Sequence, residues 1–130
     1  MKPVDFTDET VARRHFYTKS FTDILAIWTG YFKDPVCALI FLYLHEEQYK
    51  ELLVNGEPGW SKKMTVRTIS VRLNIPKSTV HTKLKYMASF EVIEAKGNNF
   101  RLRVLDDGTS SARAVLPNVG TIFDKMVSKY

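Results

Sequence analysis

The sequence predicts a mostly helical α+β fold, in which one small β-hairpin accompanies several helices. Apolar residues recur over most of the chain at the three- and four-residue spacing of a helix face. One short segment, Phe100 to Val104, instead alternates between apolar and basic residues, as a half-buried strand does. The length of 130 residues and the hydrophobic fraction of 45% suit one core, so we expect residues 1–130 to form a single domain.

A long first helix is predicted over residues 7–33. Thr7 can cap its N-terminus, and Asp8 and Glu9 place negative charge in the first turn. The apolar residues of one face follow: Val11, Phe21, Ile24, Leu25, Trp28, Tyr31 and Phe32. At 1.5 Å per residue such a helix is about 37 Å long, which is more than the core of so small a domain needs.

A second helix is predicted from Pro35 to about Leu53. Asp34 followed by Pro35 is a typical helix start. The first half, Val36 to Leu44, is apolar on every side, which indicates burial against several neighbours. Cys37 within it is therefore expected to be a small core residue rather than a reactive thiol.

Two short helices joined by a tight turn are predicted from Thr65 onwards. Ile69 and Leu73 would face the core from the first helix, and Asn74 tolerates the left-handed backbone that the turn requires. Pro76 suits the start of the second helix. The inward residues of that helix are Val80, Leu84 and Met87.

A β-hairpin is predicted directly after this helix pair. Its expected parts are a strand over Phe90 to Ala95, a turn over Gly97 to Asn99, and a strand over Phe100 to Val104. A helix-turn-helix followed by such a hairpin predicts a winged helix-turn-helix over residues 35–105.

Positive charge is concentrated in the same part of the chain. Residues 61–105 carry ten Lys and Arg against two Asp and Glu, whereas the formal charge is −3 for residues 1–60 and 0 for residues 106–130. Lysine and arginine neutralise phosphates and release counterions, so this distribution favours a polyanion as partner. Charge alone is equally compatible with an ordinary basic surface.

We therefore expect double-stranded DNA to contact the outer face of the second short helix and the hairpin. The expected DNA-binding residues are Thr65, Arg67, Lys77, Ser78, Thr79, His81, Thr82, Lys85, Tyr86, Lys96, Asn98, Asn99, Arg101 and Arg103. Among them, Thr79, His81 and Thr82 would reach base edges, and Arg101 near the hairpin tip would anchor phosphate.

The stretch from Leu73 to His81 resembles the recognition region of IclR-type repressors, and the order of elements resembles the MarR family. The MarR resemblance implies a regulator that binds a palindromic operator as a two-fold dimer. The chain departs from that family in the loop from Gly56 to Gly59 and in lacking the usual acidic and arginine pair of the wing. It has no room for the effector domain of IclR proteins.

The terminal helices are expected to form a homodimer. A helical apolar stripe is predicted over residues 115–130, and a second copy could cover it together with the long first helix (7–33). The expected interface residues are Val11, Phe21, Val119, Ile122, Phe123 and Met126. The alternative is that both helices fold back on their own monomer.

No constellation of residues predicts catalysis, a metal site or a cofactor. The three histidines are scattered, and His15 and His45 are expected at the surface or its edge. Glu46 and Glu47 are adjacent on a helix, diverge by about 100° and are expected to face solvent. The sequence therefore predicts a protein that is not an enzyme.

The chain is expected in the cytoplasm and away from membranes. Its N-terminus lacks the layout of a signal peptide, its longest apolar run is too short to span a bilayer, and its lone cysteine suits a reducing compartment. Aromatic residues of the first helix could line a pocket for a small aromatic or apolar effector, or simply form core.

The leading hypothesis is a dimeric transcriptional regulator. The alternative is a winged-helix protein-interaction or assembly module, for example in a plasmid, phage or replication complex, without specific DNA readout.

Overall fold

The computed structural model describes residues 8–57, 59–104 and 117–129. In chain order the elements are α1 (Asp8–Phe32), α2 (Pro35–Asn55), α3 (Val66–Leu73), α4 (Lys77–Ser89), β1 (Ile93–Lys96), β2 (Asn99–Leu102) and α6 (Pro117–Lys129). β1 and β2 pair as an antiparallel hairpin. The described part is thus mostly helical with one hairpin after four helices, which confirms the predicted α+β class.

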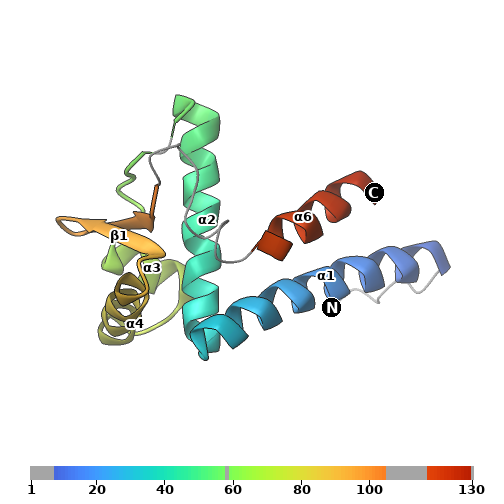
Figure 1. Cartoon of the computed structure of the whole chain (residues 1–130), viewed down its shortest axis with the longest axis horizontal. Helices are drawn as coiled ribbons and strands as arrows, with labels where there is room; N and C mark the ends of the chain where they lie inside the picture. Colours follow the sequence, from blue (N-terminus) through green and yellow to red (C-terminus); the bar gives the residue numbers. More distant parts are fainter. Residues whose placement is uncertain (1–7, 58, 105–116, 130) are drawn as a thin grey trace.

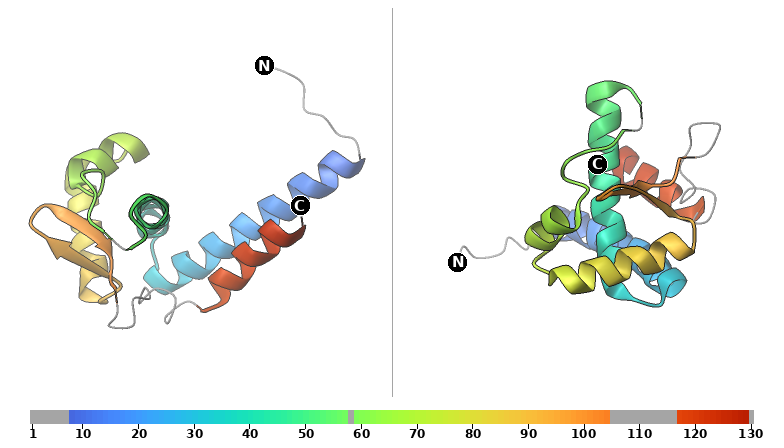
Figure 2. Two further views of the ribbon diagram at one scale, coloured as in Figure 1. Left: turned by 90° about the horizontal axis from the view of Figure 1, so that it is seen from above. Right: turned by 90° about the vertical axis from the view of Figure 1, so that its left-hand side faces the viewer.

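Helix α2 stands at the centre of the molecule (Figure 1). α3, α4 and the hairpin pack on one side of it, and we call these elements together with α2 the lobe. On the other side α1 projects away at a bend of 117° to α2, and α6 lies beside it (Figure 2). We call α1 and α6 the arm.

The long helix α1 is confirmed, and only its second half is buried. Ser20, Ile24, Trp28 and Phe32 recur every four residues as one buried stripe, and the rings of Trp28 and Phe32 pack against Phe41 of α2. The helix ends at Phe32, after which Lys33 adopts a left-handed backbone with φ of 57°. The expected cap, Thr7, lies outside the described residues.

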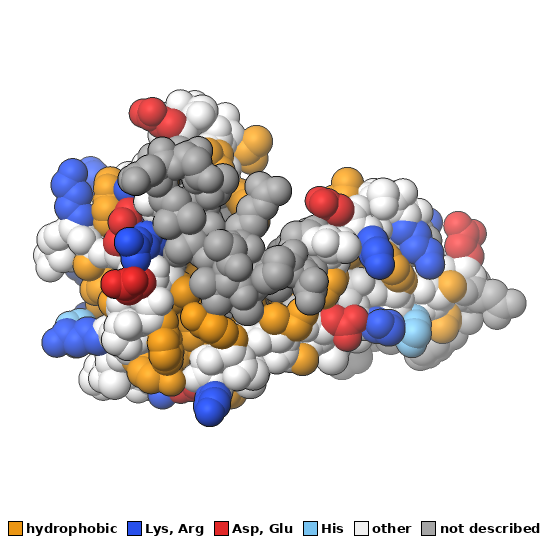
Figure 3. Space-filling model, in the orientation of Figure 1, with side chains coloured by type: hydrophobic (Ala, Val, Ile, Leu, Met, Phe, Trp, Pro, Cys, Tyr) orange, Lys and Arg blue, Asp and Glu red, His pale blue; other side chains and the backbone are white. Residues whose placement is uncertain are grey.

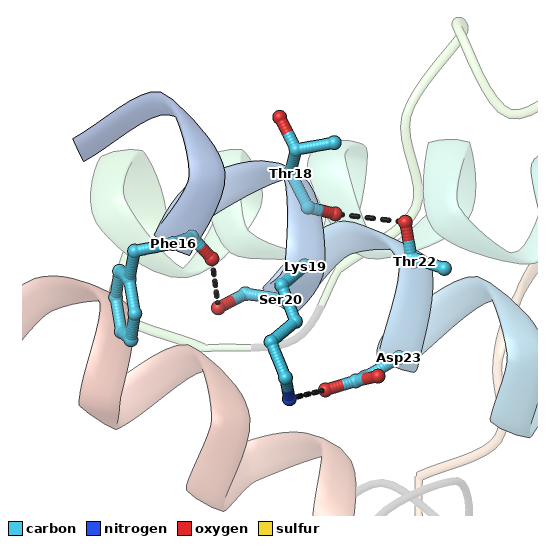
Figure 4. Close-up of polar contacts among 6 residues, drawn as sticks. All are labelled: Phe16, Thr18, Lys19, Ser20, Thr22 and Asp23. Carbon is cyan, nitrogen blue, oxygen red and sulfur yellow. Dashed lines mark hydrogen bonds and ion pairs between the residues drawn. The ribbon is translucent and has the colours of Figure 1, made fainter. Parts of the chain in front are cut away.

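Three polar contacts connect successive turns in the middle of α1 (Figure 4). Ser20 Oγ donates to the carbonyl of Phe16 at 2.9 Å, and Lys19 pairs with Asp23 at 3.0 Å. The Phe16 ring also meets α6, because Lys129 Nζ lies 4.5 Å from its centroid. The end of α6 is thereby attached to α1 of the same chain.

Helix α2 begins at Pro35, as predicted, and continues to Asn55, slightly beyond the predicted end at about Leu53. Asp34 is the N-cap and accepts a hydrogen bond from the Val36 N–H at 2.8 Å, and Pro35 is the first helical residue. Gly56 closes the helix in the left-handed conformation with φ of 75°. Cys37 is fully buried, as expected.

Two expectations for the second half of α2 are wrong. His45 is only 9% exposed, because it stacks on Trp28 of α1 at 5.1 Å between ring centroids. Its Nδ1 donates to the carbonyl of Phe41 at 2.9 Å. Glu47, expected in solvent, is also buried, since α2 is covered by the arm on one side and by β2 on another.

The predicted pair of short helices is present as α3 and α4. Thr65 caps α3 by accepting from the Thr68 N–H, and Asn74 takes the left-handed conformation with φ of 55°. Ser70 Oγ donates to the carbonyl of Ile75 at 2.5 Å, which ties the first helix to the turn. The inward residues of α4 are Val80, Leu84 and Met87, as predicted, and all are fully buried.

The hairpin is shifted from its predicted boundaries. The first strand starts at Ile93 rather than Phe90, because Phe90 closes α4 and Glu91 has a left-handed backbone with φ of 61°. The turn consists of Gly97 and Asn98, with Gly97 at φ of 60°, as in a type II′ turn. Asn99 belongs to the second strand, which ends at Leu102 rather than Val104.

The hairpin is joined to the segment that precedes α3. The Phe100 N–H donates to the carbonyl of Met64 at 2.8 Å, and Thr65 forms a β-bridge with Asn99. Met64 is fully buried, and Leu102 is almost so. The hairpin therefore packs against α2 and α4 and is joined to the start of α3, instead of projecting alone.

The arm buries part of its apolar surface within one chain. Ile122 and Met126 of α6 are half-buried against the core, whereas Val11 is exposed and Phe21 is 48% exposed on α1. The side chains of the other two expected interface residues, Val119 and Phe123, lie outside the described residues. Packing within one chain thus covers part of the apolar surface of α6. The apolar side chains Val11 and Phe21 on α1 stay exposed.

Within the described residues, no single helix is both long and apolar enough to cross a membrane. α1 and α2 meet the requirement of length and composition only when taken together across their bend.

Candidate nucleic-acid interface

The outer face of α4 is polar and basic over more than two turns. Ser78, His81, Thr82 and Lys85 are exposed and lie opposite the buried stripe of this helix, and Lys77 is exposed at its first position. Thr79, expected in the same set, is half-buried. No side chain caps the N-terminus of α4, since its N-cap is a proline. The first turn therefore presents short polar side chains and backbone N–H groups outwards.

No acidic residue lies within α3 or α4, and the first acid after them is Glu91. Residues 61–105 include ten basic residues, and the structure divides them into two groups. Four are ion-paired: Arg72 with Glu46 at 3.8 Å, Lys83 with Asp34, Arg101 with Glu94 at 2.7 Å, and Arg103 with Glu91 at 3.1 Å. The other six have no ion-pair partner within the described part of the chain: Lys62, Lys63, Arg67, Lys77, Lys85 and Lys96. All six are exposed.

Arg101 does not have the free guanidinium that its place in the sequence suggested. Its side chain is 16% exposed, its Nε donates to Glu94, and its Cζ lies 4.3 Å from the centroid of the Trp60 ring. Arg103 likewise has an internal partner in Glu91. These two expected DNA-binding residues thus hold the hairpin together in the described structure.

Three other expected residues also have structural contacts. Thr65 is half-buried as the cap of α3, and Asn99 is half-buried in β2. Tyr86 is exposed, but its Oη donates to the carbonyl of Phe32 at 3.3 Å and so faces the arm. Tyr86 therefore lies one turn after Thr82 on α4, but its hydroxyl is hydrogen-bonded to the end of α1.

The hairpin tip and α3 supply further exposed groups. Lys96 and Asn98 are exposed at the tip, and Arg67 is exposed one residue into α3. The bridge between Thr65 and Asn99 joins the tip to the start of α3. In Figure 3 basic side chains lie at the left-hand edge of the lobe, beside the hairpin and α4.

Sequence reasoning missed Lys62 and Lys63. Their backbone is fixed, because Tyr43 Oη donates to the Lys63 carbonyl at 2.6 Å and Thr68 Oγ1 to the Lys62 carbonyl at 3.4 Å. Burial, with a smaller contribution from Glu47, raises the pKa of Tyr43 to about 12, so its hydroxyl remains a donor at neutral pH. Both lysines lie inside the basic stretch 61–105, but they precede the first predicted short helix, where no pattern in the sequence indicates a fixed backbone.

The described residues contain no group of three or more His, Cys, Asp or Glu that could hold a metal ion. Burial and the nearby Asp34 carboxylate raise the pKa of Cys37 to about 11, which keeps its thiol protonated. Trp28 and Phe32 are two of the aromatic residues of the first helix that were expected to line an effector pocket or form core. Both are fully buried against Phe41.

A scan against protein-family models and searches of curated proteins and of solved structures find no match to this chain.

Proposed function

We propose that this chain is a winged-helix protein that binds double-stranded DNA, with α4 in the major groove and the β1–β2 hairpin as the wing. The order of elements supports this, since a helix pair with a left-handed turn at Asn74 is followed directly by a hairpin. The bridge from Thr65 to Asn99 also supports it, because it holds the hairpin beside the start of α3.

The observation that carries the proposal is the acid-free outer face of α4, flanked by cations without ion-pair partners in the described residues. Lys77 and Lys85 are placed to neutralise phosphates, as are Arg67 and Lys96 on the neighbouring elements. Ser78, His81 and Thr82 can donate to or accept from base edges. Positioning and reading would then be done by different side chains.

We further propose that the protein acts in the cytoplasm as a homodimeric transcriptional regulator on a palindromic operator, as the MarR resemblance implies. The exposed apolar residues Val11, Phe21 and Leu25 on α1 support a dimer, because a second copy would remove them from water. A two-fold dimer would present two copies of α4 to successive major grooves.

A second candidate function is a protein-interaction or assembly module. It is favoured by apolar side chains that the lobe leaves in solvent: Val71 of α3 is 76% exposed, and Leu53 and Val54 at the end of α2 are 88% and 73% exposed. This function requires no salt-sensitive binding to duplex.

Selection from a random pool of duplex DNA separates the two functions. We expect the protein to enrich a palindromic sequence, and we expect His81→Ala with Thr82→Ala to abolish the enrichment while leaving weak binding to any duplex. Enrichment of no sequence, together with undetectable duplex binding at low salt, would exclude the regulator. Light scattering tests the dimer, since Phe21→Glu should yield a monomer.

A further inference from the structure

Two polar contacts connect α4 to the corner where α1 meets α2. Lys83 Nζ forms an ion pair with the Asp34 carboxylate, and Tyr86 Oη donates to the carbonyl of Phe32 at 3.3 Å. Lys83 and Tyr86 are three residues apart, so they lie on the same side of α4. Both contacts reach the corner, at Asp34 and Phe32, although Tyr86 and Phe32 are 54 residues apart in the chain.

An aromatic contact extends this connection. The Phe90 ring at the end of α4 lies 4.7 Å from the Tyr86 ring, 5.9 Å from that of Tyr31 and 6.3 Å from that of Phe32, measured between centroids. These distances are typical of packed aromatic pairs. One side of α4, from Lys83 to Phe90, is therefore attached to the corner between α1 and α2, while the outer face stays exposed.

Asp34 serves both helices at once. Its Oδ1 accepts from the Val36 N–H as the cap of α2, and its Oδ2 contacts Lys83. Burial alone would raise the pKa of Asp34, but the hydrogen bonds from Lys83 and the Val36 N–H outweigh it, and the net pKa lies below the ordinary 3.8. The carboxylate is charged at neutral pH, and its side chain is only 19% exposed, so water screens the pair less than a surface pair.

We propose that Lys83 and Tyr86 are positioning residues that fix the orientation of α4 relative to the arm. This inference rests on the proposed function for its consequence on DNA. In a dimer held by its arms, the orientation of each α4 sets the distance between the two reading helices, and hence the spacing of half-sites that the protein accepts. Neither side chain needs to touch DNA for this role.

The first test measures the orientation directly, without DNA. Nitroxide labels on Thr22→Cys of α1 and Thr82→Cys of α4 report their separation by electron–electron double resonance, with unlabelled protein added so that only labels within one chain are seen. Cys37 is buried and stays unlabelled. We expect one narrow distance distribution, broadened at least twofold by Asp34→Asn, Lys83→Met or Tyr86→Phe. Lys83→Arg, which keeps the positive charge, should keep the distribution narrow. Lys50→Met, which replaces an exposed lysine of α2, should leave the distribution unchanged. Unaltered widths in all three variants would overturn the inference.

The second test uses the palindromic duplex that the unaltered protein selects from a random pool, with one or two base pairs inserted at its centre. We expect insertion to weaken binding at least tenfold for the unaltered protein and less than threefold for Asp34→Asn and for Lys83→Met, while all bind a single half-site equally. Variants that keep the tenfold discrimination would overturn the role in spacing. If the unaltered protein selects no duplex, the proposed function fails, and the distance measurement still decides whether Lys83 and Tyr86 orient α4.

Discussion

The guanidinium of Arg101 lies over the ring of Trp60, with 4.3 Å between Cζ and the ring centroid. Arg101 is in β2 and faces Glu94 across the hairpin, whereas Trp60 belongs to the segment before α3. This one side chain thus connects the second strand, the first strand and the entry to α3. Its position indicates a structural role for a residue that the sequence placed at the DNA.

Replacing Arg101 should therefore weaken the fold. A cation–π contact and a cross-strand ion pair contribute about 0.5 to 1 kcal/mol each, so we expect Arg101→Ala to lower the free energy of unfolding by about 1 to 2 kcal/mol. Acrylamide should also quench the fluorescence of Trp60 more strongly. Arg101→Lys keeps the charge but not the planar group, so its free energy of unfolding should lie between those of Arg101→Ala and the unaltered protein. Unchanged stability with a shallower salt dependence of duplex binding would instead return Arg101 to the phosphate-binding set.

The turn between α3 and α4 makes a matched pair of substitutions informative. Asn74 has φ of 55°, a conformation that costs a β-branched residue about 1 to 2 kcal/mol and glycine almost nothing. Asn74→Val should thus destabilise the protein by about that amount in urea denaturation, while Asn74→Gly should be nearly neutral. Equal effects of the two variants would show that the turn is not left-handed.

His45 should make stability depend on pH. Burial lowers its pKa from 6.5 to about 4, although the hydrogen bond to the Phe41 carbonyl opposes the shift. The unfolded chain therefore binds a proton more readily than the folded one between pH 6.5 and about 4, and stability falls as pH decreases through that window. The shift corresponds to a loss on the order of 3 kcal/mol.

Urea denaturation at several pH values measures this loss. His45→Gln should flatten the dependence between pH 6.5 and 4, whereas His15→Gln, at an exposed position of α1, should not. If both variants follow the unaltered protein, another group is responsible.

Replacing His81 or Thr82 with alanine should affect sequence readout selectively. Both are exposed in the first turns of α4, and a base-edge contact contributes about 1 to 3 kcal/mol of discrimination. We expect that loss on the selected duplex and almost none on a scrambled one, by fluorescence anisotropy. Thr22→Ala on the arm is the matched control. A loss of equal size on both duplexes would mean that α4 positions the protein but does not read bases.

Local signals in the sequence were sufficient for most elements. Asp34 with Pro35 predicts the start of α2, and Asn74 predicts the turn between α3 and α4, because each acts on its immediate neighbours. The hairpin boundaries were less accurate. Phe90 suits a strand by residue type, yet the contacts at the end of α4 determine the backbone of Phe90 and Glu91.

Contacts between segments that are far apart in the chain could not be predicted from the sequence. His45 is buried because α1 crosses α2 at Trp28, and no spacing along α2 reveals that crossing. The same limit applies to the candidate site. The charge distribution predicts the basic stretch, but it does not predict which of its lysines and arginines form ion pairs. Arg101 and Lys85 look alike in sequence, and only the fold gives the former an acid and an aromatic ring.

The salt dependence of duplex binding tests the central claim most directly. Each phosphate neutralised contributes about −0.9 to the slope of log affinity against log salt, so six or more contacts per dimer predict a slope of about −5 or steeper. Lys77→Ala with Lys85→Ala should make the slope shallower by about two for each copy, while Lys50→Ala with Lys125→Ala, which removes the same charge from α2 and α6, should leave it unchanged. A flat salt response of the unaltered protein, or equal slopes for the two double variants, would contradict DNA binding by the outer face of α4.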